Sequence, residues 1–241
     1  MSAYGLLPTL QSTREPLLPT IYTMKAKSSP TPLRKNWTHI SVHHITLSTA
    51  PVNLVKALYK EFSSELERDQ ARTYPQEAGM TEDEFKSYFF ARDVFVGIGF
   101  KDDSGGSSIQ SRQLGSVEES RIGREWNDAV AGFYYVKPNY PGHSSHICNA
   151  GFVIPPSARG LGLGYLLGAS YLHYAPLLGY RGSIFNLVYA DNPASLKIWD
   201  ALGFQRVGLV PGAGKRVKPR EDSNGEEIYY VDAHIIYKSF V

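Results

Sequence analysis

The residues best suited to ligand chemistry lie in one glycine-rich stretch of the sequence. An apolar run at 152–154 is followed by Arg159 and by three glycines at alternate positions, Gly160, Gly162 and Gly164. This order predicts a buried strand, a turn and the start of a helix. Backbone N–H groups at such a turn point outward at the positive end of the helix dipole, and glycine lets a ligand approach closely. The stretch therefore predicts a phosphate or pyrophosphate site, with a flexible turn before a helix as the alternative.

Two nucleotide-binding motifs do not fit this turn. The dinucleotide fingerprint requires G-x-G-x-x-G and an acidic residue about twenty positions further on. Here the third glycine comes one position early, and the first acidic residue downstream is Asp191. The P-loop requires Gly-Lys-Ser/Thr, and the sequence contains no such triplet. A different kind of phosphate ligand is therefore expected.

A second motif follows the apolar run at 183–189. It reads Asn-Pro-Ala-Ser-Leu-Lys-Ile-Trp-Asp-Ala-Leu-Gly-Phe and begins at Asn192. Asn192 is a good N-cap, Pro193 suits the first helical position, and Gly203 stands where a helix ends. The motif predicts a short helix that leads into another strand.

Together the two motifs resemble the GCN5-related N-acetyltransferase (GNAT) superfamily, through Arg-x-x-Gly-x-Gly at 159–164 and the asparagine, short helix and Gly-Phe at 192–204. The resemblance implies an α/β fold: a central mixed, mostly antiparallel sheet with splayed central strands, flanked by helices. It also implies acetyl-CoA as co-substrate, with no metal. Strand backbone would hold the pantetheine arm, and the turn would hold the pyrophosphate. The coenzyme-binding residues implied are Phe152, Val153, Ile154, Arg159, Gly160, Leu161, Gly162, Leu163, Gly164, Asn192 and Lys197.

A narrower resemblance links segments 73–76, 135–140, 148–152, 175–180, 183–188 and 204–211 to yeast N-acetyltransferases that detoxify azetidine-2-carboxylate, a proline analogue. It implies that the acceptor is a small imino acid. Asn149 would hold this substrate, and the backbone N–H groups of Asn186 and Leu187 would receive its carboxylate. Asn192 would be catalytic, its amide donating to the coenzyme sulfur. The alternatives are a purely N-capping role for Asn192 and surface charge for Arg159 and Lys197.

Asparagine is depleted inside strands, which favours a functional reading of Asn149 and Asn186. Neutral amides can orient a carboxylate and stabilise a thiolate, but they cannot act as bases. No Asp or Glu lies between Asp128 and Asp191, so those strands carry no carboxylate base. How the amine loses its proton is left open.

The remaining candidate bases are Glu65, Glu67 or Glu77, a water chain, or the loop histidines His143 and His146, whose spacing is a poor metal signal. Trp199 stands where many relatives carry a tyrosine that protonates the thiolate, and an indole cannot usefully give up a proton. Two alternatives follow: a transferase of the same fold acting on another small amine or a peptide N-terminus, and a non-catalytic acyl-CoA binding module.

Composition excludes several classes. A net charge of +2 over 241 residues argues against a nucleic-acid surface, and no apolar run reaches the roughly 18 residues of a membrane span. The single cysteine, Cys148, excludes an internal disulfide. It also fits a reducing compartment, so a cytoplasmic location is expected. Neighbouring strand residues face opposite ways, so Cys148 is expected on the sheet face away from Asn149, as a buried residue and not a nucleophile. Relatives suggest a homodimer.

The order of the chain predicts three regions. Residues 1–36, rich in Pro, Ser and Thr, are expected to be a disordered extension, with a mitochondrial transit peptide as the alternative. Residues 37–241 are expected to form a single domain, with 101–128 as a solvated insertion loop. The basic cluster at 215–220 is interpreted as a solvated loop.

Periodicity and capping patterns predict the elements of the domain. Strands are expected at 38–47, 94–100, 129–137, 147–154, 183–189, 204–210 and 229–237. A first helix is expected after Pro51, a second behind the capping box of Thr81 and Glu84, and a third that begins at Leu161 and ends or kinks at Pro176.

Overall fold

The structure is a computed structural model that describes residues 15–25, 35–69, 72–102, 112–219 and 225–241. Its described strands form one sheet in the order β1-β2-β3-β4-β5-β6-β8-β7, antiparallel throughout except between β5 and β6. The mixed, mostly antiparallel sheet predicted from the sequence is confirmed. The strands are β1 Thr20–Thr23, β2 His39–Ile45, β3 Asp93–Phe100, β4 Val130–Pro138, β5 Ile147–Val153, β6 Gly182–Tyr189, β7 Gln205–Pro219 and β8 Glu226–Ser239.

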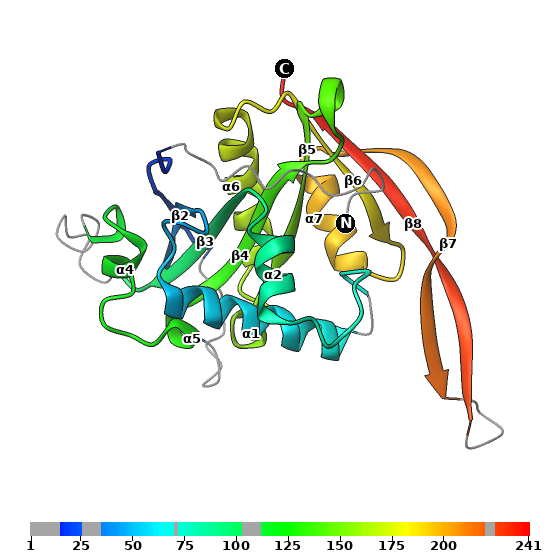
Figure 1. Ribbon diagram of the computed structural model, residues 1–241, viewed down its shortest axis with the longest axis horizontal. Coiled ribbons are helices and arrows are strands. Elements are labelled where there is room, and N and C mark those ends of the chain that lie inside the picture. Colours follow the sequence, from blue (N-terminus) through cyan, green and yellow to red (C-terminus); the bar gives the residue numbers. More distant parts are fainter. Residues whose placement is uncertain (1–14, 26–34, 70–71, 103–111, 220–224) are drawn as a thin grey trace.

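Helices cover both faces of this sheet (Figure 1). α1 (Val52–Asp69) and α2 (Glu82–Phe89) pack on one face, together with the short α4 (Val117–Ser120) and α5 (Trp126–Ala129). α6 (Leu163–Leu177) and α7 (Pro193–Ala201) pack on the other. The expected first helix is present as α1, and it buries Leu54, Leu58 and Phe62. The capping box that starts α2 is also present. Within the described residues, no helix is both long and apolar enough to cross a membrane.

The central strands separate near the middle of the sheet. β5 and β6 pair in parallel only at Ile147↔Gly182 and Cys148↔Ser183, after which the two strands diverge. On the other side of β6, the register with β8 is interrupted between Phe185 and Val188. The expected splay is therefore present, and it opens the sheet next to the N-termini of α6 and α7.

Two expectations about extended segments are wrong where the structure describes them. Residues 20–23, inside the expected disordered extension, form β1 and pair with β2. The expected solvated loop at 101–128 contains α4 and part of α5, and it buries Val117 and Trp126. Apolar side chains spaced along a charged, glycine-rich segment are enough to attach it to the core. Residues 1–14, 26–34 and 103–111 lie outside the described part of the chain.

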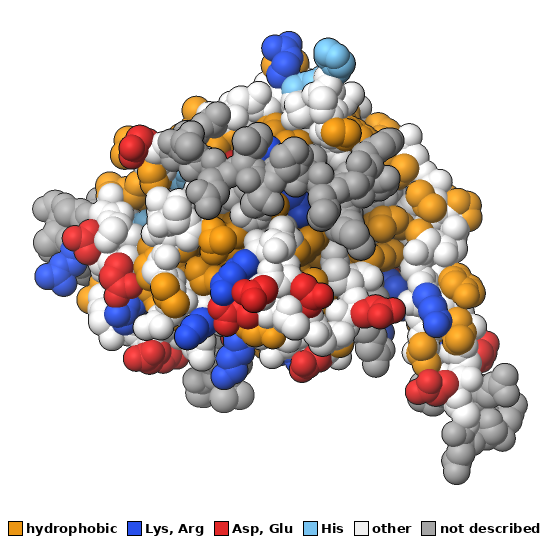
Figure 2. Space-filling view, viewed as in Figure 1, with side chains coloured by type: hydrophobic (Ala, Val, Ile, Leu, Met, Phe, Trp, Pro, Cys, Tyr) orange, Lys and Arg blue, Asp and Glu red, His pale blue; other side chains and the backbone are white. Residues whose placement is uncertain are grey.

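The basic cluster at 215–220 is not a solvated loop where the structure describes it, and residue 220 lies outside the described residues. It belongs to β7, which pairs with β8 in a long hairpin that extends beyond the body of the molecule (Figure 1). Arg216 is only 3% exposed, because its guanidinium pairs with Asp191 and lies over the Tyr189 ring at 4.4 Å. On the face in Figure 2, acidic and basic side chains are interspersed over the body, and apolar side chains are visible along the hairpin.

Candidate functional site

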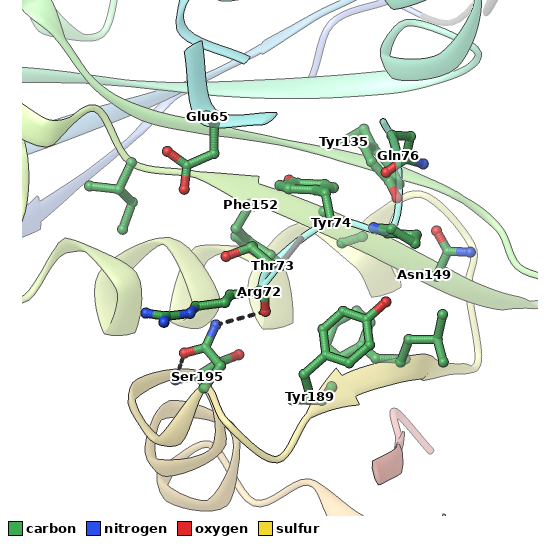
Figure 3. A pocket seen from close by; sticks show the side chains of 18 of the residues that line it. Glu65, Arg72, Thr73, Tyr74, Gln76, Tyr135, Asn149, Phe152, Tyr189 and Ser195 are labelled. Carbon is green, nitrogen blue, oxygen red and sulfur yellow. Dashed lines mark hydrogen bonds between the residues drawn. The ribbon is translucent and has the colours of Figure 1, made fainter. Parts of the chain in front are cut away.

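A large cleft lies where β5 and β6 separate. Its walls come from the C-terminal parts of β5 and β6, the segment at 72–80 after α1, and the N-termini of α6 and α7. Figure 3 shows Tyr74 in the middle of this cleft, with Asn149, Gln76 and Tyr135 on one side and Arg72 and Ser195 on the other. The cleft therefore joins the glycine-rich turn to the asparagines singled out in the sequence.

The glycine-rich turn has the backbone conformation that an anion site requires. Gly160 and Gly162 adopt φ values of +75° and +80°, a region that other residues rarely enter. Gly162 is the N-cap of α6 and provides no side-chain cap, so the N–H groups of the first turn are open to a ligand. A Cβ added at Gly162 would meet nothing within 4 Å, so the turn is open on its outer side. The residues present fit a pyrophosphate bound at the helix N-terminus.

Other residues expected around the coenzyme have further contacts. Gly164 allows close packing of α6 on α7, because a Cβ there would lie 2.7 Å from Cδ1 of Ile198. The guanidinium of Arg159 pairs with the carboxylate of Glu65, which links the turn to α1. Lys197 is exposed on α7. The Phe152 ring lies on the same side of the sheet as α6 and α7. Leu161 and Ile154 are half-buried at the turn, whereas Val153 and Leu163 are buried.

Three asparagine side chains meet on the cleft wall. Asn139 Oδ1 accepts from Nδ2 of Asn149 at 2.6 Å and from Nδ2 of Asn186 at 2.7 Å. Asn149 Oδ1 is buried and has no hydrogen-bond partner among the described residues. The side chains of Asn149 and Asn186 are thus brought together. Asn139, which links them and is 5% exposed, was missed by the sequence argument.

Asn186 and Leu187 lie in the interruption of the β6–β8 register. Both are exposed and line the cleft, on the side where β5 has already left β6. Backbone groups in a bulge are released from the regular ladder and become available to other partners. This position fits the predicted role of their N–H groups.

Asn192 caps α7 and also faces the cleft. Its Oδ1 accepts from the backbone N–H of Ser195 at 3.1 Å, which confirms the predicted N-cap. Its Nδ2 donates to the backbone carbonyl oxygen of Arg72 at 3.5 Å. Because the oxygen forms the cap and one N–H bonds to Arg72, the second N–H of the amide is available to a ligand.

A half-buried lysine and its aromatic neighbours were also missed. Lys137 lies opposite Asn149 in the β4–β5 register and lines the cleft. Its Nζ donates to the carbonyl oxygen of Tyr88 at 3.0 Å and lies 3.9 and 4.2 Å from the ring centroids of Tyr88 and Tyr135. Burial lowers the pKa of Lys137 to about 7. The two tyrosine hydroxyls are 3.0 Å apart.

Trp199, Cys148 and the two loop histidines differ in burial. Trp199 is buried, and its indole N–H donates to Oγ of Ser195 at 3.0 Å. Cys148 faces the core on the opposite side of the sheet from Asn149, and burial raises its pKa to about 12. His143 and His146 are exposed. Within the described residues, no three His, Cys, Asp or Glu side chains are placed to hold a metal ion.

Comparisons with known proteins give a consistent result. A model of the acetyltransferase (GNAT) family matches residues 55–204. N-acetyltransferase aca1 of Schizosaccharomyces pombe is 35% identical over 174 residues, which are 72% of this chain and 75% of that protein.

Two solved structures share the fold at low identity. A GCN5-related N-acetyltransferase from Kribbella flavida has a TM-score of 0.58 at 21% identity, over 82% of this chain and 97% of that chain. A GNAT phosphinothricin acetyltransferase from Sinorhizobium meliloti, in complex with acetyl-CoA, has a TM-score of 0.54 at 16% identity, over 82% and 88%.

Proposed function

This chain belongs to the GNAT family of acetyltransferases, and we propose that it moves the acetyl group of acetyl-CoA onto the secondary amine of a small imino acid. Family membership makes the chain an N-acetyltransferase, so the reading as a non-catalytic acyl-CoA module is set aside. The proposal adds the acceptor class, azetidine-2-carboxylate or a proline-related compound. The observation that carries it is the cluster of uncharged amides on the cleft wall, with one buried oxygen left to accept a hydrogen bond.

We place the coenzyme along the splay between β5 and β6. The N-terminus of α6, with Gly160 and Gly162, would hold the pyrophosphate, and the backbone of β5 around Phe152 would hold the pantetheine arm. Support comes from the positive φ angles, the uncapped helix start and the early end of β5–β6 pairing. When bound, the coenzyme supplies the thioester. Every other contribution comes from residues of this chain.

We place the acceptor over Asn149. A secondary amine has one N–H in its neutral form, and the buried Oδ1 of Asn149 is a suitable acceptor for it. The acceptor's carboxylate would lie at the bulge, on the N–H groups of Asn186 and Leu187. Asn139 would hold Asn149 and Asn186 in place through its own Oδ1. Because neutral donors receive the carboxylate, the reactive amine is the main group that must lose its charge.

The chemistry requires a neutral amine held against the thioester carbonyl and a donor for the leaving sulfur. Holding the two reactants together contributes through proximity. Asn192 Nδ2 is free of the capping bond and would donate to the sulfur as negative charge develops there. A hydrogen bond to a charged group contributes about 1.5–3 kcal/mol.

The test is a panel assay that follows free thiol release from acetyl-CoA. We expect release with azetidine-2-carboxylate and proline analogues, and little with polyamines or peptides. Preference for a polyamine or a peptide N-terminus would select the alternative acceptors of the same fold. Binding of acetyl-CoA without release on any amine would contradict the proposal.

A homodimer is part of the proposal, with the β7–β8 hairpin as its contact. A two-stranded ribbon is marginally stable alone in water. The outer part of this hairpin exposes Val217, Ile228 and Tyr230, the last by 64%. A second copy would cover these apolar side chains. Sedimentation should show that I228D lowers the mass to that of a monomer, whereas V52D, at an exposed valine on α1, does not. A monomeric mass for the wild-type protein would contradict the proposed homodimer.

A further inference from the structure

Lys137 is placed where the acceptor's amine must lose its proton. Lys137 and Asn149 are direct partners across the antiparallel pair of β4 and β5, so their side chains leave the same face of the sheet. Directly opposed residues have Cβ atoms about 4.5–5.5 Å apart. Both side chains line the cleft. An amine that donates to Asn149 Oδ1 therefore comes within reach of the ε-amino group of Lys137.

We propose that Lys137 is the general base of the acetyl transfer and takes the proton from the acceptor's amine nitrogen. This inference rests on the proposed function for the position of the acceptor. It requires only that some amine occupies the cleft over Asn149, and it does not depend on which amine that is. It supplies the base that the asparagines cannot provide.

Three of the carboxylates lining the cleft already have partners, whereas Glu77 is exposed. Glu65 pairs with Arg159, and Asp191 pairs with Arg216. Glu84 belongs to the capping box of α2, where its carboxylate accepts from Thr81. Lys137 has no carboxylate partner among the described residues. Its contacts are a carbonyl oxygen and two aromatic faces. A neutral amine can donate one N–H to Tyr88 and keep its lone pair for a proton.

Two effects act on this amine in opposite directions. The faces of Tyr88 and Tyr135 favour the charged ammonium, whereas burial favours the neutral form. Burial is the larger effect and sets the pKa near 7, so a substantial fraction is neutral at physiological pH.

The titratable groups around Lys137 are few. The segment at 72–80 carries Arg72, Tyr74 and Glu77. α2 carries Tyr88 and, in its first turn, Glu82, Asp83 and Glu84, with Lys86 one turn further on. Arg92 precedes β3, and Asp93 of β3 bonds to His44 on the other side of the sheet. On β4 itself the neighbour is Tyr135, and β5 contributes only Cys148, on the opposite face.

The step balances without a further reactant. As the amine nitrogen bonds to the acetyl carbon, its one N–H leaves Asn149 Oδ1 and turns to Lys137, and the proton moves to the Nζ lone pair of the lysine. The C–S bond breaks, and its electron pair goes to sulfur, where Asn192 donates. The lysine then releases its proton to water, and the thiolate takes one from water. The enzyme returns to its starting state.

The experiment compares K137R, K137M and the matched surface variant K56R. It uses the amine that the panel shows to be the best acceptor. K137R keeps a positive charge but cannot lose it near neutral pH. We expect kcat to fall about 100-fold or more in both Lys137 variants, with acetyl-CoA binding unchanged. In the wild type and K56R, kcat should rise as the pH passes through about 7, and this limb should be absent in the Lys137 variants.

A second measurement on the wild type does not depend on how the variants fold. The modification rate of each lysine by acetic anhydride is followed across pH by mass spectrometry. Lys137 should reach half its maximal rate near pH 7, below the value of about 10 for a lysine in a model peptide. The proposal would be overturned if K137R kept a near-wild-type kcat while K137M showed a raised KM for the acceptor. That result would mean that the lysine binds the acceptor's carboxylate as a cation. Titration of Lys137 with the ordinary lysines would also overturn it.

Discussion

Asn139 and Asn149 share a short hydrogen bond, 2.6 Å from Nδ2 of Asn149 to Oδ1 of Asn139. Because this bond fixes which end of the Asn149 amide faces Asn139, the opposite end, Oδ1, is buried without a partner among the described residues. A buried acceptor without a partner is unfavourable, and a ligand N–H relieves it. The pair thus defines where the acceptor's nitrogen is expected.

Replacing Asn149 should weaken acceptor binding more than it slows turnover. In N149A the acceptor loses one hydrogen bond to a buried partner, which corresponds to about 1–3 kcal/mol. The KM for the imino acid should rise about 10- to 100-fold, and the KM for acetyl-CoA should change little. Steady-state kinetics with each substrate varied in turn checks this. A fall in kcat as large as the rise in KM would contradict the assignment.

Asn139 should act through Asn149 and not on its own. N139A removes the acceptor that holds both Asn149 and Asn186. Its effect on the acceptor KM should therefore overlap with that of N149A. In a double-mutant cycle on kcat/KM, the interaction energy should lie between about 0.5 and 3 kcal/mol. If the effects of N139A and N149A on kcat/KM simply add as free energies, Asn139 has no positioning role.

Asn192 carries two functions that substitution can separate. N192A should lower kcat about 10-fold or more and also destabilise the protein by about 1 kcal/mol through loss of the N-cap. N192S keeps an N-cap oxygen but has no amide donor. Stability should return in N192S while kcat stays low. If kcat recovers together with stability, Asn192 is only a cap.

Substitutions at two glycines should weaken the binding of different ligands. A Cβ at Gly151 would lie 2.6 Å from Cε1 of Tyr135 and 2.9 Å from Tyr74, so G151A forces rigid rings apart in the acceptor pocket. We expect a loss of about 1–3 kcal/mol in stability and a raised acceptor KM. G162A meets open space but must adopt φ +80°, and it should weaken acetyl-CoA binding instead. Thermal unfolding and KM values test this contrast; the same kinetic pattern in both variants would contradict it.

The buried His43 should make stability depend on pH. Burial lowers its pKa from 6.5 to about 4. Between these values the unfolded chain binds a proton that the folded chain does not, so stability should fall as the pH drops from 6.5 towards 4. The slope from this group is at most about 1.4 kcal/mol per pH unit. The free energy of unfolding is measured with urea at several pH values for the wild type, H43N and the exposed-site control H146N. Only H43N should show a weaker dependence of this free energy on pH. Equal slopes would exclude His43 as the source.

Local patterns predicted the half of the fold that holds the glycine turn. The strand before Pro155, the glycines at 160–164 and the cap at Asn192 are each encoded by neighbouring residues, and each lies where expected. β1 was missed because its four residues are stabilised by pairing with β2, which no local pattern shows. β7 continues nine residues beyond the expected 204–210, because its pairing with β8 resumes after register shifts.

The site was predicted only in part, for a related reason. Asn149, Asn186 and Asn192 stand out as single residues, whereas Lys137 and Asn139 gain meaning only from their cross-strand neighbours on β5. The β4–β5 register depends on the turn at 139–146, which the sequence does not fix. Alternation along 133–139 places Lys137 on the same face as Phe133 and Tyr135, and a lysine on an otherwise aromatic face was the available signal.

The central claim is that uncharged amides receive the two ends of an imino acid. The most direct measurement is the ratio of kcat/KM for azetidine-2-carboxylate to that for azetidine, which has the same ring nitrogen and no carboxylate. Loss of the charged hydrogen bonds at Asn186 and Leu187 predicts a ratio of about 100 or more, at about 1.5–3 kcal/mol for each bond. A ratio near one would contradict the account, because the cleft would then recognise the amine alone.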